Sequence, residues 1–219
     1  MKIAMINASP RLLIRRNDTC TANTVLQDCR RLLRRSHLHD FEDFHLKTAY
    51  LSDKDKKALF DCDIWLLSFP VYMMGLPSHL MAVMQTLEQE AAERGPREIR
   101  VYALANMDLY EGNNAYPAFR MLSLWCEACR FSWCGGMGIG GGFLHRSPAV
   151  SQIALFRKHT YHRRLSVFAE AVGSGSPILN TNSTPDMSRK SYVLKHNQYY
   201  RSEARKQGLA ALDITSQPL

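Results

Sequence analysis

The sequence predicts an open, doubly wound α/β fold in which the strands of one sheet run parallel and helices cover both faces. Short apolar runs without polar alternation indicate strands that are buried on both sides. The segments between them carry apolar residues at helical spacing, which is typical of amphipathic helices. Strand and helix alternate about five times, and parallel neighbours need crossovers of about a dozen residues or more, so this order favours a parallel sheet.

Five segments are predicted to be strands. The first apolar run opens directly into a polar loop, and Pro70 ends the third run. The second run has the weakest pattern and is expected at an edge of the sheet. The predicted strands span residues 3–6, 41–46, 64–69, 99–105 and 131–139.

Helices are expected between and after these strands. Ser52 is a predicted N-cap, and Gly95-Pro96 is a predicted helix end. The first helix has one apolar stripe, made of Val25, Leu26, Cys29, Leu32 and Leu33. The predicted helices span residues 25–35, 52–60, 76–94, 115–129, 150–172 and 187–207.

The length indicates one domain with an appendage. The chain has 219 residues, more than one typical domain of roughly 100–150 residues and fewer than two. We expect a single domain over residues 1–172 and a linker with a basic C-terminal arm over residues 173–219. The basic segment has few apolar residues and needs a surface on which to fold, so we predict that it embraces a second copy in a homodimer.

Composition narrows the class of protein. Hydrophobic residues make up 46% and charged residues 22% of the chain, so it can bury a core and is not disordered. No apolar run approaches the roughly 20 residues that a membrane span needs. The first residues lack the apolar centre of a secretory leader, which predicts a cytoplasmic protein. The 28 basic and 20 acidic residues give a charge of +8, which favours an anionic partner.

The six cysteines are expected to be free thiols, because a core of this size needs no disulfide. Cys126 and Cys129 continue the apolar stripe of a predicted helix. Together with Cys134 they lack a fourth ligand, so core cysteines are favoured over a metal or iron–sulfur site. The sequence therefore predicts no metal site.

Three loops are candidates for a ligand site, because ligands of doubly wound sheets bind at the carboxyl ends of the strands. The loop 7–24 offers hydroxyls and backbone N–H groups at a helix start, where the helix dipole favours an anion. It lacks the Gly-Lys-Ser/Thr of a P-loop, so a monophosphate is favoured over a triphosphate. A capped helix after a long loop is the alternative. The apolar loop 70–76 and the mixed loop 106–112 suit a flat heterocycle.

Four segments carry a resemblance to a known family: KIAMINASPR, ANTVL, DIWLLSFPVYMMGLPSHL and NMDLYEGNNAYPAFRMLSLWCEACRFSWCGGMGIGGG. Over most of residues 1–172 they resemble the flavodoxin-like NAD(P)H-dependent FMN reductases. The resemblance implies a five-stranded sheet with FMN at the point where the winding reverses. It also implies NADH or NADPH as co-substrate and a quinone, a free flavin or another small molecule as electron acceptor.

The resemblance further implies which residues contact the cofactor. It places Ser9, Arg11, Asn23 and Thr24 at the FMN phosphate, Pro70, Val71, Tyr72 and Met73 along the isoalloxazine, and Asn106, Tyr110, Glu111 and Gly112 at the third flavin loop. The segment from Arg11 to Ala22 is longer than in many members, which leaves the phosphate contacts open. No catalytic acid or base is predicted, because FMN supplies its own redox chemistry.

Two further patterns have competing interpretations. Gly136, Gly138 and Gly141 match G-x-G-x-x-G, but no acidic residue lies about 20 positions further on, so tight backbone geometry is favoured over a dinucleotide fingerprint. The second pattern is a group of basic residues between positions 157 and 164, with His159 and His162. The favoured interpretation is a helix face exposed to solvent. Binding of the NADPH phosphates is its alternative.

Two other functions stay open. A nucleic-acid or membrane-surface binder would use residues 30–35 and the basic C-terminal segment. No zinc pattern, aromatic platform or helix-turn-helix signature accompanies that charge, so no nucleic-acid partner is predicted. A flavodoxin proper would carry electrons to a protein partner. Such carriers tend to be acidic, so the charge of +8 favours an enzyme.

Overall fold

The computed structural model describes residues 1–10, 20–36, 38–145 and 159–209. Arg11 lies outside the described residues, and so does the first part of the helix predicted over residues 150–172. None of the helices in the described part of the chain is long and apolar enough to cross a bilayer.

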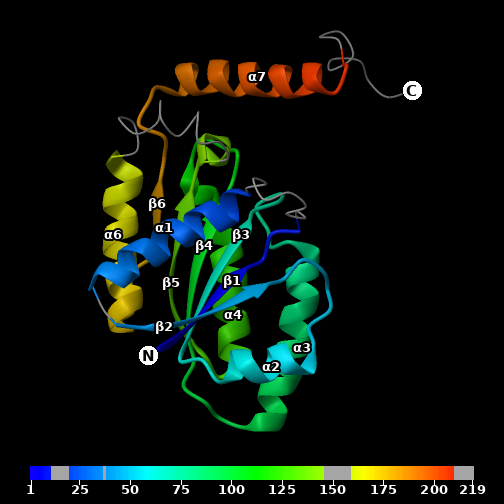
Figure 1. The fold of residues 1–219 in the computed structure, drawn as a ribbon, viewed down its shortest axis with the longest axis vertical. Helices are drawn as coiled ribbons and strands as arrows, with labels where there is room; N and C mark the ends of the chain where they lie inside the picture. Colours follow the sequence, from blue (N-terminus) through cyan, green and yellow to red (C-terminus); the bar gives the residue numbers. More distant parts are fainter. Residues whose placement is uncertain (11–19, 37, 146–158, 210–219) are drawn as a thin grey trace.

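The strands form one six-stranded sheet in the order β2-β1-β3-β4-β5-β6, and every neighbouring pair is parallel (Figure 1). The five predicted strands are confirmed, including the weak one at the edge. The sixth, β6, was not predicted: its three polar residues, Thr-Asn-Ser, lie in the segment expected to be a linker. The strands are β1 (Lys2–Asn7), β2 (Asp40–His45), β3 (Ile64–Pro70), β4 (Arg100–Asn106), β5 (Ser132–Ile139) and β6 (Thr181–Ser183).

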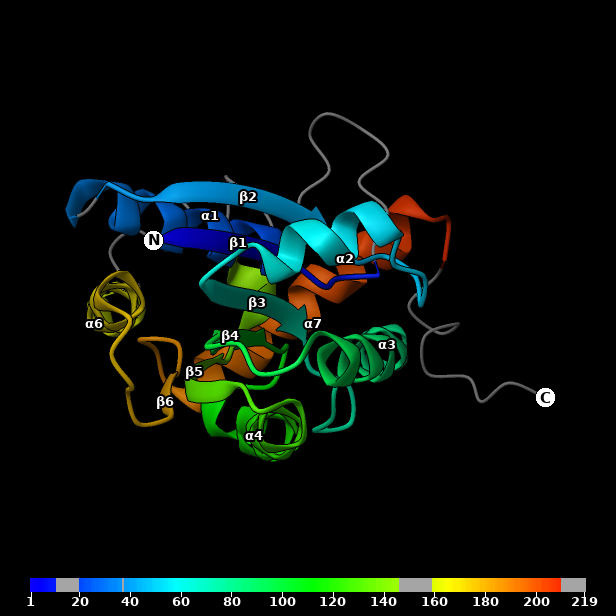
Figure 2. The same ribbon diagram turned by 90° about the horizontal axis from the view of Figure 1, so that it is seen from below.

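Helices cover both faces of the sheet (Figures 1 and 2). One face packs against α1 and α6, and the other against α2, α3 and α4. Ser52 caps α2 as predicted, because its hydroxyl accepts the N–H of Asp55 at 3.1 Å. The helices are α1 (Thr21–Ser36), α2 (Asp53–Phe60), α3 (Ser78–Arg94), α4 (Tyr116–Cys129), α6 (His159–Ser174) and α7 (Arg189–Lys206), with 3-10 turns η1 (Gly112–Ala115) and η2 (Gly142–His145).

The core lies in two layers, one on each side of the sheet. In β1, Ile3 and Met5 pack toward α1 and α6, whereas Ala4 and Ile6 pack toward the opposite layer. Strands buried on both faces need apolar residues at every position, which explains their continuous apolar runs. All six cysteines are buried and free, as predicted.

The glycines of β5 allow the loop after β4 to lie directly on the strand. A Cβ atom on Gly138 would come within 2.0 Å of the carbonyl oxygen of Gly112, and one on Gly136 within 2.7 Å of the ring of Phe119. Gly141 has a φ of 70°, a conformation that favours glycine. The G-x-G-x-x-G pattern therefore reflects close packing in addition to tight turn geometry.

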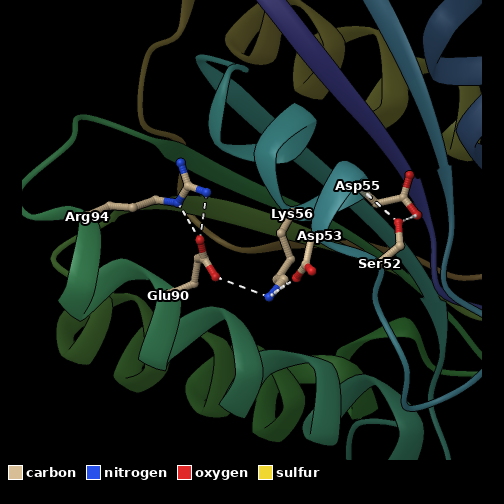
Figure 3. A network of polar contacts seen from close by, with 6 residues as sticks. All are labelled: Ser52, Asp53, Asp55, Lys56, Glu90 and Arg94. Atoms are coloured by element: carbon tan, nitrogen blue, oxygen red, sulfur yellow. Dashed lines mark hydrogen bonds and ion pairs between the residues drawn. The ribbon is translucent and has the colours of Figure 1, made fainter.

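A network of ion pairs joins α2 to α3 (Figure 3). Lys56 Nζ lies 2.6 Å from Asp53 Oδ1 and 3.3 Å from Glu90 Oε2, and Glu90 also pairs with Arg94. The hydrogen bond from Arg94, assisted by Lys56, lowers the pKa of Glu90 below its ordinary value of 4.5. Its stabilising contribution is therefore present above that value and is lost as the pH falls through the lowered pKa. Because Glu90 and Arg94 lie near the end of α3, this network is far from the loops that follow the strands.

We expect Gly138→Ala to destabilise the fold because the added Cβ meets backbone that cannot move aside. Overpacking of this kind costs about 1–3 kcal/mol or more. Gly75→Ala is the matched control, since its Cβ would lie 3.6 Å from its nearest neighbour. Urea unfolding of both variants measures the difference in free energy, and equal stabilities would contradict the close-packing account.

Candidate functional site

The described residues of the three candidate loops, 7–10 with 20–24, 70–76 and 106–112, lie at one edge of the sheet, where β1, β3 and β4 end side by side (Figure 1). The N–H of Ala8 donates to the carbonyl of Ser68 at 2.8 Å, and the N–H of Val71 donates to the carbonyl of Asn106 at 2.8 Å. The chain goes from β1 to β2 on one side and reaches β3 on the other, so the winding reverses between β1 and β3. This is the position at which doubly wound sheets bind ligands.

A cysteine occupies the capping position of α1. Cys20 Sγ accepts the N–H of Asn23 at 3.4 Å and the side-chain amide of Asn7 at 3.8 Å. The carbonyl of Cys20 accepts both the N–H of Thr24 at 3.0 Å and its hydroxyl at 3.2 Å. The N–H of Ser9 donates to Asn7 Oδ1 at 3.2 Å. Sequence reasoning missed Cys20 because serine, threonine, aspartate and asparagine are the usual caps.

These bonds describe the surroundings of the predicted phosphate contacts Asn23 and Thr24, which stay predictions. The N–H of Asn23 and the hydroxyl of Thr24 already have partners within the turn, and the hydroxyl of Thr21 donates to the carbonyl of Gly142 at 3.0 Å. The first N–H groups of a helix have no partner inside it. Among the described residues, no bond to the N–H groups of Thr21 and Ala22 or to the side-chain amide of Asn23 is seen, so these groups are candidate donors to an anion.

The second loop is a tight turn held in an unusual conformation. Tyr72 and Gly75 exchange two backbone hydrogen bonds, of 3.2 and 2.8 Å. Met73 and Met74 between them have φ angles of 49° and 63°, a left-handed region that side chains rarely occupy. The turn leaves Met73 fully exposed and Tyr72 and Met74 about half exposed. Strain of this kind is often retained at functional sites.

Two residues predicted in the third loop have structural roles. Asn106 is buried, and its side-chain amide donates to the carbonyl of Phe69 at 2.9 Å, which ties the end of β4 to β3. Gly112 is buried against the backbone of Gly138 and Ser183. Both residues therefore support the third loop from its buried side.

Comparison with known proteins shows a likeness in structure. No protein-family model matches this chain, and no curated protein sequence matches it. An NADH:FMN oxidoreductase in its apo form is 14% identical over 80% of this chain and 89% of its own, with a TM-score of 0.53. A flavodoxin of Streptococcus pneumoniae is 11% identical over 80% and 99%, with a TM-score of 0.51. An azoreductase of Bacillus anthracis is 12% identical over 77% and 98%, with a TM-score of 0.50.

The chain has a flavodoxin-like fold. The resemblance seen over residues 1–172 is thus confirmed at the level of the fold, with β6 added beside β5.

In this flavodoxin-like fold the C-terminal helix docks on the third loop of its own chain. The hydroxyl of Tyr192 donates to the carbonyl of Asp108 at 2.5 Å, and that of Tyr200 donates to the Asp108 carboxylate. From the loop, the hydroxyl of Tyr110 donates to the carbonyl of Met187 at 2.6 Å. Figure 1 shows α7 crossing above the carboxyl ends of the strands.

An ion pair and an aromatic cluster complete this attachment. Glu111 Oε1 lies 2.9 Å from the guanidinium of Arg189. Phe143 in η2 contacts the rings of Tyr192, His196 and Tyr199, with centroids 5.3–5.5 Å apart. Tyr110 and Glu111, both predicted at the flavin, thus contact α7. Sequence reasoning missed this docking, although regularly spaced aromatic residues on a basic helix were its signal.

The two cysteines of α4 are buried thiols of the core. Burial raises the pKa of Cys129 to about 12 and that of Cys126 further still. Within the described ranges, no cluster of three or more metal-binding side chains occurs.

The basic group on α6 lies beside β6, the outermost strand on one side of the sheet. Arg163 and Arg164 line a groove of about 570 Å³ with Val167, Leu179 and Thr181, and Arg164 donates to the hydroxyl of Thr181 at 3.1 Å. The groove lies beside β6, three strands away from the pair β1 and β3. Binding of NADPH phosphates there stays a prediction.

We expect Tyr192→Ala to release α7, because this buried ring lies at the centre of the aromatic cluster. Loss of a buried aromatic side chain costs roughly 3–5 kcal/mol, and Tyr192 also donates one of the hydrogen bonds that hold the helix. Val193→Ala, at an exposed neighbour on the same helix, is the control. Limited proteolysis should cleave residues 189–206 faster in the tyrosine variant alone. Equal cleavage of both variants would show that this ring does not hold the helix.

Proposed function

We propose that this chain binds FMN at the carboxyl edge of its sheet and acts as an NAD(P)H-dependent oxidoreductase. Its electrons would pass to a quinone, a free flavin or another small acceptor. The observation that carries the proposal is the meeting of three loops at the point where the winding of a flavodoxin-like sheet reverses. The likeness to an NADH:FMN oxidoreductase and an azoreductase supports it.

The groups at this edge fit the two ends of FMN. The N–H groups of Thr21 and Ala22 at the start of α1 suit a phosphate, and the dipole of the helix adds to their attraction. Ser9 and Arg11 are proposed to complete this end of the site. The exposed side chains of Tyr72 and Met73 suit a flat aromatic ring. When bound, FMN supplies the chemistry of accepting a hydride and passing electrons on.

The residues of the third loop hold the site in shape. Asn106 fixes the ends of β3 and β4, and Gly112 allows the loop to lie on β5. The side chains of Tyr110 and Glu111 join the third loop to α7. We therefore propose that these side chains restrain the loop, and that only the backbone of the two residues contacts the flavin. A homodimer and a cytoplasmic location stay predictions.

The basic end of α1 gives little support to nucleic-acid binding. Arg30 pairs with Asp43 at 2.8 Å and Arg31 with Asp28 at 3.2 Å. The guanidiniums of Arg30 and Arg34 also lie over the ring of Phe41. Part of this charge is therefore engaged within the chain.

Titration with FMN tests the proposal. We expect saturable quenching of flavin fluorescence at one FMN per chain, followed by bleaching of the visible spectrum when NADH or NADPH is added without oxygen. A protein that binds FMN but is not bleached would be an electron carrier without its own NAD(P)H site. A protein that quenches no FMN would overturn the proposal.

Met73→Ala should weaken FMN binding. Full burial of a methionine side chain is worth about 1.5–3 kcal/mol, so we expect the dissociation constant to rise about tenfold or more. Met81→Ala, at a partly exposed methionine of α3, is the matched control and should leave the constant unchanged. Similar constants for both variants would remove the second loop from the site.

A further inference from the structure

The C-terminal helix is held along the carboxyl edge at more than one point. Tyr192 and Tyr200 both bind Asp108 and lie eight residues apart, which is about 12 Å along a helix. Met187 and Arg189 hold the start of the helix on the same loop. Figures 1 and 2 agree that α7 runs across this edge from the side of β5 and β6.

This helix carries much of the positive charge of the chain. Its 18 residues, RKSYVLKHNQYYRSEARK, include six lysines and arginines and one glutamate. Two of the six cations are paired, Arg189 with Glu111 and Lys206 with Glu203. Across the described ranges of the chain, no ion pair involves the other four, which are Lys190, Lys195, Arg201 and Arg205.

The two carboxylates of the third loop offset only part of this charge, because the helix carries six cations and one glutamate. Glu111 is paired with Arg189, and the carboxylate of Asp108 accepts the hydroxyl of Tyr200. The edge of the sheet beneath α7 is therefore expected to have a positive potential. Such potentials raise the local concentration of anions and speed their association.

Several apolar side chains are exposed at the same edge. The turn of the second loop exposes Tyr72, Met73 and Met74, and Leu109 is half exposed on the third loop. Aromatic and thioether side chains form good contacts with flat rings. A ligand that enters here thus meets an apolar turn together with a cationic helix.

We propose that α7 is a cationic roof over the cofactor site and selects small planar acceptors that carry a negative charge. The inference rests on the proposed function, because it concerns the acceptor of the same site. In the reaction, a quinone acceptor takes up two electrons and two protons to become the hydroquinone. The reduced FMN that supplies them is oxidised in the same step.

The test follows the acceptor half-reaction by itself. The full-length protein loaded with FMN is reduced with dithionite and mixed in a stopped-flow instrument with 1,4-naphthoquinone or with 1,4-naphthoquinone-2-sulfonate. Because no nicotinamide is present, the result does not depend on how the coenzyme binds. The flavin content of every sample is measured first.

The decisive variant is K195E/R201E, which reverses two unpaired cations of the roof. We expect the rate with the sulfonate to fall tenfold or more, as for a loss of electrostatic steering, while the rate with the neutral quinone changes little. The wild-type rate with the sulfonate should also fall as salt is added. K54E/K57E on α2, at the other end of the molecule in Figure 1, makes the same change in net charge and should alter neither rate.

Three results would overturn the inference. Equal losses with both quinones would indicate damage to the site in general, and no loss with either would show that the roof does not act on the acceptor. Equal effects of the two double variants would show a dependence on net charge alone. Absence of bound FMN in the wild type would overturn the proposed function, whereas normal FMN content with any of these three results would overturn only the role of α7.

Discussion

The parallel pairing of β1 on both of its sides is the constraint on which the rest of the molecule depends. Each parallel pair requires a crossover to the other end of the sheet. The loops after β1, β3 and β4 must therefore emerge at one edge, and α1 must begin there. Because β2 and β3 lie on opposite sides of β1, the connections that follow β1 and β3 go in opposite directions. A crevice for a ligand is expected between them.

A second contact places the C-terminal helix. The absence of side chains at Gly112 and Gly138 lets the loop after β4 lie on β5, and that loop holds Asp108 where Tyr192 and Tyr200 reach it. A segment with weak helix amphipathicity thus folds because a surface of its own chain supports it. The basic arm expected to embrace a second copy has a docking surface within this chain. The close packing of Gly112 and Gly138 thus helps to position the positively charged helix α7.

The sequence predicted the parts of the fold that are governed by local patterns. Continuous apolar runs identified β1 and β3, and Ser52 identified the start of α2. Patterns could not reveal β6, because three polar residues become a strand only when the edge of β5 is beside them. The sulfur cap of Cys20 and the left-handed pair Met73 and Met74 depend on contacts within folded loops. The bonds between α7 and Asp108 join residues more than 80 positions apart. The spaced aromatic residues of the helix indicate that it docks, but they do not identify Asp108 as the partner.

The central claim is that the three loops at the carboxyl edge form one binding site for FMN. Hydrogen exchange of the backbone, measured by mass spectrometry with and without FMN, tests it most directly. The account predicts slower exchange in residues 20–24, 70–75 and 106–112 together, with no change along the groove beside Arg163 and Leu179. Unchanged exchange in those three loops, or protection confined to that groove, would contradict it.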